Sequence, residues 1–471
     1  MRSRRLFTVA GIVLLGLGAA LYLRSPQKAA TGGPQLVPDA GGPVTLAVCS
    51  VNSARRALLH NARLAANIVN ALPERARILL LVNDRDAFRI ASNPWPQRVS
   101  FVELPADTPI TIWPQDPFLV LRDREGRGRL LVSREFDRAG DRAMAARIAA
   151  TLGWSCDDSS LTFEGGNIVA DSDHAFVGAN TIRYNAIKFA LSDPEVVERF
   201  ERELGRPVLV VGPLPQPIAH IDMMLTPLGD RRLALADPAW GARVAEKEVA
   251  QAPDRVEAFE RRCEQMYLPG KAATRGLRDA EGHAIRPPRV VGRTRQAIEQ
   301  SRAMAPSLDR LAEELAACGY DVVRIPYLSH RERSPATAPG TPATHNDRGR
   351  TDTAPADDRA DTDEDFKPEY PQLTYNNVLL ELTDNRRIVY LPQYDWPALD
   401  DLARDLVTHG RHAGDVHMPV VADLDVRAAG RTVLDLDLHL TRAAHRLRDV
   451  LDAQVSGGVE TQCLHLDHSS S

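Results

Sequence analysis

Short apolar runs alternate with amphipathic segments along most of the chain. The apolar runs are rich in Val, Ile and Leu and are bounded by turn-forming residues, which is typical of buried β-strands. These predicted strands are Val44–Val48, Arg77–Asn83, Arg129–Phe136, Leu161–Ala170, Pro207–Gly212, Met223–Leu228, Arg232–Asp237, Asp321–Leu328, Asn376–Leu382 and Arg387–Tyr394. Between them, apolar residues recur with helical spacing at Ala54–Leu72, Arg142–Leu152, Pro194–Leu204, Arg255–Tyr267, Arg293–Ala317 and Trp396–Thr408. Strands that alternate with helices predict an α/β fold.

The N-terminus carries a different pattern. Leu6–Leu23 contains no charged residue and follows the basic sequence MRSRR. As a helix it would be about 27 Å long, close to the roughly 30 Å of a bilayer core. We therefore expect residues 1–30 to form a membrane anchor, with the basic cluster in the cytoplasm and the body of the chain outside it. The alternative is a signal peptide cleaved after Ala30, which would leave a secreted protein. A Gly/Pro-rich linker is expected at residues 31–43.

The body is expected to be one domain, residues 44–471, with a single interruption. Arg331–Pro371 is rich in Pro, Thr, Ala and Asp and is nearly free of large aliphatic residues. Such a segment cannot bury enough apolar area to offset its ordering entropy. We interpret it as a disordered insertion between two strands.

Charge and motif content exclude several classes of function. The formal net charge of −5 is small for 471 residues, and there is no basic stripe, so no nucleic-acid partner is expected. No GxGxxG sequence follows the first strand and no Walker loop is present, which argues against nucleotide binding. The five cysteines form no CxxC pair and no zinc-like Cys/His spacing.

Candidate chemistry lies where polar residues interrupt or border the apolar runs. Such residues are usually turn aspartates, bulge glycines or inert cysteines when they occur singly. Buried polar groups cost free energy unless they are paired, so we expect these clusters to face one another in a shared cleft. They are WPQD at Trp113–Asp116, EGGN at Glu164–Asn167, His220 with Asp222, the pair Asn376 and Asn377, and Cys463 after the diglycine Gly457–Gly458.

In this order, the clusters resemble those of the guanidine-modifying enzymes. The resemblance is strongest to the agmatine deiminase and bacterial-type peptidylarginine deiminase family, whose first motif reads Trp-x-Arg-Asp or Trp-x-Gln-Asp. WPQD has the glutamine form, and NNVLLE…RRIVYLPQYD looks like the family's late pair of strands. The resemblance spans Val44 to Leu466 apart from the insertion. It implies a five-bladed, pseudo-symmetric α/β propeller around a central polar channel.

The resemblance implies a nucleophile, an acid–base residue and a residue that orients it. Cys463 would attack the guanidinium carbon as a thiolate. His220 would protonate the departing amine and then activate water. Glu164 would orient His220 and maintain its charge.

It also implies four substrate-binding residues. Asp116 and Asp222 would grip the guanidinium from two sides through charge-assisted hydrogen bonds. Trp113 and Asn167 would complete the binding site. The substrate would be agmatine, arginine or peptidyl arginine, the products a ureido compound and ammonia, and no metal or organic cofactor would be required.

Two other functions stay open. The same residues could transfer the amidino group to an amine instead of to water. A membrane-anchored guanidine-binding protein without turnover is the third hypothesis. It is favoured by the sequence GGVETQC, where Cys463 stands one residue further from the diglycine than is usual in the family and follows Gln462.

Overall fold

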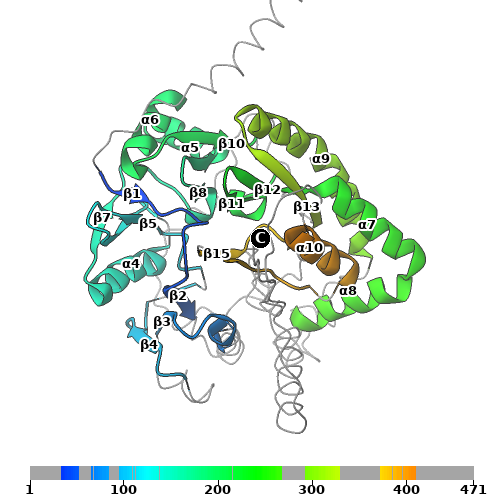
Figure 1. The fold of residues 1–471 in the computed structure, drawn as a ribbon, viewed down its shortest axis with the longest axis horizontal. Helices are drawn as coiled ribbons and strands as arrows, with labels where there is room; N and C mark the ends of the chain where they lie inside the picture. The colour runs from blue at the N-terminus through cyan, green and yellow to red at the C-terminus, as the bar shows by residue number, and fades with distance from the viewer. Residues whose placement is uncertain are drawn as a thin grey trace, which may run out of the picture.

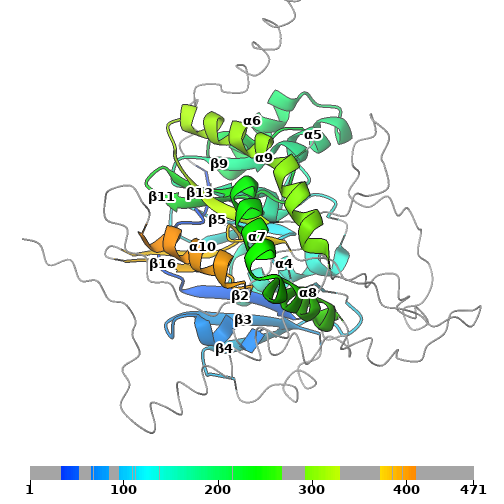
Figure 2. The same cartoon turned by 90° about the vertical axis from the view of Figure 1, so that its right-hand side faces the viewer.

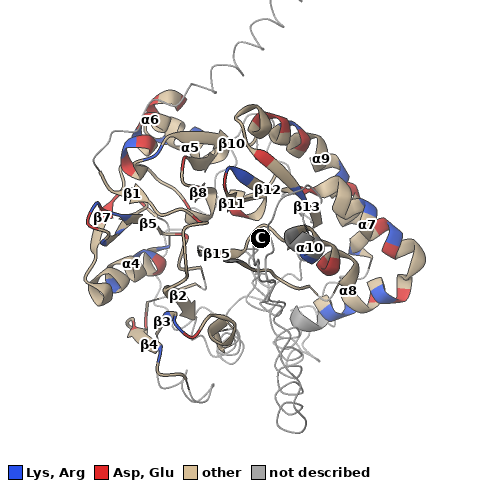
Figure 3. Cartoon of the chain, viewed as in Figure 1, with Lys and Arg blue, Asp and Glu red and all other residues tan. Residues whose placement is uncertain are grey.

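The computed structural model describes most of the body of the chain. The described residues are 33–51, 65–66, 68–83, 95–108, 110–111, 113–136, 138–214, 216–267, 292–328, 372–383, 386–394 and 396–409. Small sheets lie around a centre, and most helices lie on the outside (Figure 1). Charged residues are most frequent on these peripheral helices (Figure 3). The predicted α/β class is confirmed, whereas no sheet closes on itself among the described strands.

Three of the sheets share one plan. A β-hairpin is followed by one or more helices and then by a strand that joins the hairpin in parallel, β6 with β7, β9 with β10 and β12 with β13. A parallel return requires a crossover, and the helices supply it. The first unit contains β5 Phe118–Arg122, β6 Gly128–Val132, α4 Ala139–Leu152 and β7 Ser155–Asp158. The second contains β8 Ile168–Ala170, β9 Ala175–Gly178, α5 Ala179–Lys188, α6 Asp193–Leu204 and β10 Val208–Val211. The third contains β11 Leu225–Gly229, β12 Arg232–Asp237, α7 Pro238–Gln251, α8 Pro253–Tyr267, α9 Arg293–Ala317 and β13 Asp321–Leu328.

The remaining elements form two more sheets and extend the first three. One sheet is parallel, with β3 between β2 and β4, and the other is a hairpin of β15 and β16 followed by α10. Two short strands, β1 and β14, pair with β5 and β13. Their bounds are β1 Gln35–Leu36, β2 Leu46–Val51, β3 Arg77–Val82, β4 Val99–Glu103, β14 Leu373–Thr374, β15 Leu379–Thr383, β16 Arg386–Tyr390 and α10 Pro397–His409.

The described part of the expected linker packs against this fold. After β1, the Val37 N–H donates to Val120 O of β5 at 2.9 Å, and the Asp39 N–H donates to Ala170 O of β8 at 2.9 Å. Further on, the carbonyl of Gly42 accepts from the Leu382 N–H of β15 at 3.2 Å. The segment therefore crosses three sheets before β2 begins.

Apolar periodicity explains most of these elements. β3 reads RILLLV and is buried from its second residue onward, as the central strand of a parallel sheet should be. Helix α6 begins with a capping box formed by Ser192 and Glu195 and ends at Gly205, whose φ is 63°. Its buried face presents Val196, Phe200 and Leu204 at helical spacing.

The structure corrects one predicted strand and adds two helices, α5 and α7, and four strands of more than two residues, β4, β5, β7 and β9. The predicted strand Leu161–Ala170 is not continuous, because a 3₁₀ turn at Gly165–Asn167 precedes β8. Helix α7, which was not predicted, packs with α8 and α9 on one side of the fold (Figure 2). Its buried residues are mostly small, and a Cβ at Gly241 would lie 2.1 Å from Tyr327 O. Small residues allow this close approach but give almost no hydrophobic pattern. Helix α5 was also missed.

The apolar stretch Leu6–Leu23 and the insertion Arg331–Pro371 lie outside the described residues, as does most of the predicted helix Ala54–Leu72. Within the described part of the chain, every helix is too short or too polar to cross a bilayer. The strands on either side of the insertion are paired, since Leu328 of β13 is the register partner of Leu373 of β14.

Candidate active site

The polar clusters occupy the same position in each repeated unit, the turn before the first strand of the hairpin. Asp116 lies in the turn that precedes β5, and the 3₁₀ turn η1, Gly165–Asn167, precedes β8. A second 3₁₀ turn, η2, spans Ile221–Met223, carries Asp222 and precedes β11. The turns are in contact, since the Gly165 N–H donates to Asp116 O at 2.8 Å and η1 touches η2. Three distant parts of the sequence thus form one site.

The two glycines of EGGN make this contact possible. A Cβ at Gly165 would lie 2.2 Å from Gln115 O, inside the first turn. A Cβ at Gly166 would lie 2.6 Å from His220 Nδ1 and 2.9 Å from Asp222 Oδ2. Any other residue at either position would separate the turns.

His220 and Glu164 form the close pair that the sequence predicts. His220 Nε2 lies 2.7 Å from Glu164 Oε2, and the exposed fractions of the two side chains are 9% and 20%. Burial opposes protonation of His220, but the hydrogen bond to Glu164 and the negative charges of Asp222 and Asp116 outweigh it and raise the pKa to about 9. The imidazole is therefore a cation at neutral pH.

Asp222 is half-buried beside His220. Its Oδ1 is buried and has no hydrogen-bond partner among the described residues. Burial raises the pKa of Asp222 to about 7, opposed by His220 and assisted by the negative charges of Asp116 and Asp39. An unpaired buried carboxylate oxygen is costly, so this atom is suited to a ligand that brings a donor.

Asp116 is also buried and faces the same site. Its Oδ2 accepts a hydrogen bond from the Arg138 guanidinium, and the two groups form an ion pair. Burial raises the pKa of Asp116, while the positive charges of His220 and Arg138 lower it. A carboxylate between Trp113 and an apolar strand is thus compensated by a partly buried cation at its side.

The other two predicted binding residues lie at the edges of this group. The Trp113 ring packs near Arg138, whose Cζ is 5.7 Å from the ring centre. Asn167 Oδ1 accepts from Gln216 Nε2 at 3.1 Å, and Gln216 also donates to Ile218 O at 2.7 Å. Asn167 therefore braces the loop that carries His220, and its contact with substrate stays a prediction.

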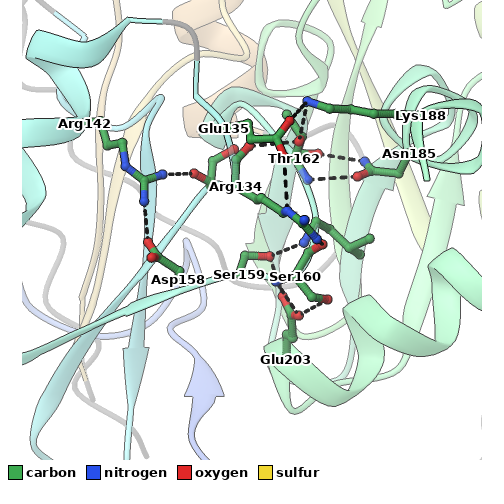
Figure 4. A network of polar contacts seen from close by, with 12 residues as sticks. Arg134, Glu135, Arg142, Asp158, Ser159, Ser160, Thr162, Asn185, Lys188 and Glu203 are labelled. Carbon is green, nitrogen blue, oxygen red and sulfur yellow. Dashed lines mark hydrogen bonds and ion pairs between the residues drawn. The ribbon is translucent and has the colours of Figure 1, made fainter.

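The segment that leads to Glu164 is fixed by a polar network (Figure 4). The Thr162 backbone N–H donates to Asn185 Oδ1 at 2.8 Å, and Asn185 Nδ2 donates to Thr162 O at 2.7 Å. Glu203 of α6 accepts from the Ser160 N–H at 2.9 Å and from Ser160 Oγ at 2.6 Å. Helices α5 and α6 thereby hold the approach to η1, which fixes where Glu164 meets His220.

Comparison with known proteins gives structural matches alone. No protein-family model matches the sequence, and no curated protein matches it significantly. The chain is similar in structure to agmatine deiminases. The agmatine deiminase of C. jejuni is 13% identical, with a TM-score of 0.49 over 83% of this chain and 91% of that one. The agmatine deiminase of Enterococcus faecalis is 12% identical, with a TM-score of 0.46 over 87% of this chain and 98% of that one.

A dimethylarginine dimethylaminohydrolase also matches, at 14% identity and a TM-score of 0.27, over 59% of this chain and 91% of that one. These neighbours are guanidine-modifying hydrolases. Identities and TM-scores this low decide neither the substrate nor the mechanism of this chain. Both have to be argued from its own side chains.

Three residues of the site were not predicted from the sequence. Arg138 and Gln216 have been described above. The third, Asp39, lies in the expected linker and accepts from the Ala170 N–H at 2.6 Å. Its side chain is exposed, yet the surrounding protein raises its pKa to about 6 by desolvation. The dipeptide Pro-Asp before two glycines predicts only a turn, so no local signal marked it.

The predicted nucleophile, Cys463, lies outside the described residues. The paired asparagines lie before β15, the strand that opens the next hairpin, so they occupy the same position as the other clusters. Asn376 is buried and its Nδ2 donates to Ala234 O at 2.9 Å. The structure brings Asp116, Glu164, His220 and Asp222 together, and the roles expected of them in binding and catalysis stay predictions.

Proposed function

We propose that this chain binds a guanidinium cation between Asp116 and Asp222 and hydrolyses it to a ureido product and ammonia. The observation that carries the proposal is the buried Asp222 Oδ1, which has no hydrogen-bond partner among the described residues. A guanidinium is a planar cation with several fixed N–H donors, which suits a pair of buried carboxylates. Its positive charge would also relieve the repulsion between Asp116 and Asp222, which now helps to keep the pKa of Asp222 high.

The reaction follows from these groups together with the Cys463 thiol. The Cys463 thiolate attacks the guanidinium carbon and forms a C–S bond. His220 donates its proton to the departing nitrogen as the C–N bond breaks, which releases ammonia and leaves an amidino-thioether. The neutral His220 then takes a proton from water, whose oxygen attacks the same carbon. The C–S bond breaks, the proton that remains on the oxygen passes to the solvent, and the ureido product and the Cys463 thiolate are released.

The charge state of His220 supports this order of events. With a pKa of about 9, His220 carries its proton at neutral pH and is ready to act as the acid of the first step. It becomes a base only after ammonia has taken that proton. Glu164 stabilises the protonated form and orients the ring, as the third member of a catalytic triad does.

We also propose the architecture and location that go with this activity. Five sheets around a centre, three of them with the same hairpin–helix–strand plan, support a five-bladed propeller. Leu6–Leu23 would anchor the chain in a membrane, with the catalytic domain outside the cytoplasm.

Ammonia release from agmatine, arginine and a peptidyl-arginine substrate tests the function. We expect release from at least one substrate without an added amine. D116N and D222N should each lower kcat/KM by about two to three orders of magnitude, because losing one partner of a buried charge pair costs about 3–5 kcal/mol.

C463S should abolish release while guanidine binding persists. C49S is its matched control, because Cys49 lies in β2 and burial raises the pKa of its thiol. Binding without ammonia release in the wild-type protein would favour the non-catalytic alternative. Turnover only with an added amine would favour amidino transfer.

A further inference from the structure

Arg138 lies between two acidic side chains at the edge of the site. Its guanidinium pairs with Asp116 Oδ2, and its Nε lies 2.8 Å from Asp141 Oδ2. The exposed fractions of the side chains are 30% for Arg138, 8% for Asp116 and 0% for Asp141. One cation, Arg138, thus forms ion pairs with two buried carboxylates.

Asp141 is an anchor for this cation. Its Oδ1 accepts from the Thr111 N–H at 2.7 Å, and its Oδ2 accepts from Thr111 Oγ1 at 2.7 Å. The carbonyl of Thr111 in turn accepts from Ser50 Oγ at 2.7 Å, at the end of β2. These bonds tie Asp141, in the first turn of α4, to Thr111 and through it to β2, so it cannot follow Arg138 if that side chain moves.

Two aromatic rings further restrict Arg138. Its Cζ lies 5.0 Å from the centre of the Phe136 ring and 5.7 Å from that of Trp113. Rings at these distances attract a cation and exclude water from part of its surface.

We propose that Arg138 is a positioning residue that holds Asp116 Oδ2 from the side of Asp141 and so presents Oδ1 to the guanidinium of the substrate. This inference rests on the proposed function, in which Asp116 is a ligand of that guanidinium. No described residue donates a hydrogen bond to Asp116 Oδ1, whereas Oδ2 is engaged by Arg138. The arrangement leaves one edge of the carboxylate for a second cation.

Arg138 also affects the charge of Asp116. Burial raises the pKa of this carboxyl and Arg138 lowers it, so losing Arg138 would leave Asp116 neutral over more of the pH range. The other charged groups around Asp116 are Glu164 before η1, His220 and Asp222 at η2, and Asp141 behind Arg138. A neutral carboxyl cannot balance a guanidinium charge.

The contrary hypothesis is that Arg138 occupies the place of the substrate and must be displaced. Its departure would leave Asp141 buried without its cation, which is strongly unfavourable. Arg138 is therefore expected to stay in place when substrate binds.

The experiment compares R138M and R138K with wild type by kcat, KM and the pH profile of kcat/KM for a guanidine that the wild type hydrolyses. R138M should lower kcat/KM about tenfold to a hundredfold, mainly through KM, and should move the acid limb of the profile to higher pH. R138K should keep the acid limb close to that of wild type, because the charge remains, but should recover only part of kcat/KM. One ammonium lacks the fork that reaches both carboxylates.

The matched control is R147M. Arg147 lies further along α4 and is exposed. This variant should keep kcat/KM within about twofold, because substitutions of exposed residues away from the site change little. If Arg138 acts through Asp116, R138M should lower kcat/KM much less in the D116N background than in wild type.

Higher kcat/KM or a lower KM in R138M would overturn the proposal in favour of a competing side chain. Equal losses in R138M and R147M without a shifted acid limb would reduce Arg138 to a structural residue. If the wild type hydrolyses no guanidine, it is the proposed function that fails. The coupling of Arg138 to Asp116 is still decided by a double-mutant cycle on urea unfolding, which needs no substrate, and additive effects there would refute it.

Discussion

Replacing Glu164 with glutamine should remove much of the pH dependence that His220 gives to folding stability. Burial disfavours the His220 cation, but the hydrogen bond to Glu164 and the charges of Asp222 and Asp116 raise the pKa from 6.5 to about 9. At 1.36 kcal/mol per pH unit, that difference corresponds to about 3 kcal/mol of folding free energy. Since the Glu164 side chain is 20% exposed and two other acids contribute, we assign roughly 2 kcal/mol to Glu164.

The sign follows from the two pKa values. The folded protein keeps the His220 proton up to a pH of about 9, whereas the unfolded chain loses it near 6.5. The stabilisation is therefore fully present below 6.5 and is lost as the pH rises through about 9, with a slope of up to about 1.4 kcal/mol per pH unit. Asp222 titrates near 7 in the folded state, so its contribution changes mainly below the pH range of the test.

Urea unfolding of the wild type and E164Q at about pH 7.5 and pH 9 measures this effect. The difference in unfolding free energy between the two proteins should shrink by about 1–2 kcal/mol at the higher pH. The control is E195Q, which makes the same change at an exposed helix cap with no histidine partner. Its difference from wild type should be the same at both pH values. A constant difference for E164Q as well would refute the assignment of the His220 charge to Glu164.

Three further predictions follow from the fold, the site and the N-terminus. D222N should bind a guanidine at least about a hundredfold more weakly by calorimetry while its melting temperature does not fall, because a carboxylate whose buried Oδ1 has no donor among the described residues is replaced by a neutral amide. A lower melting temperature with unchanged binding would contradict this. Deleting Arg331–Asp365 should change the unfolding free energy by only about 1 kcal/mol, since Leu328 and Leu373 are already paired and loop length acts logarithmically. Loss of helix and strand signal in circular dichroism would show that the segment packs. In cells that express the full chain, the protein should be in the membrane fraction and the body should be digested when spheroplasts are treated with protease. A body protected from protease would exclude the proposed orientation, and a soluble form that begins near Thr31 would show a cleaved signal.

Local pattern was sufficient for much of the fold. The burial of β3 can be predicted from its apolar run, and that of one face of α6 from its amphipathic spacing. The turns at Asp116 and Asp222 could be found for the same reason, because a polar residue at the border of an apolar strand is visible without a structure. Predicting that these turns lie close together required the resemblance of the whole series of motifs to a known family, since no single motif indicates it.

What could not be predicted depends on contacts between distant segments. Arg138 comes close to Asp116 because the β5–β6 hairpin reverses the chain and α4 then begins beside the first turn. Asp39 joins the site because β1 pairs antiparallel with β5 and leads the chain toward Asp116 and Ala170. Neither residue interrupts an apolar run, so its sequence neighbours give no indication of a buried partner.

The repeated plan explains why motifs far apart in sequence form one site. Asp116, Glu164 and Asp222 each lie just before the first strand of a hairpin, and the helical crossovers that separate the hairpins lie at the periphery. The crossovers can therefore differ in length, from one helix in the first unit to three in the third, without moving the turns. The turns themselves have no such freedom, because Gly166 already brings η1 against His220 and Asp222. Differences in crossover length are thus confined to the periphery. The central turns can lie this close together only because position 166 is a glycine.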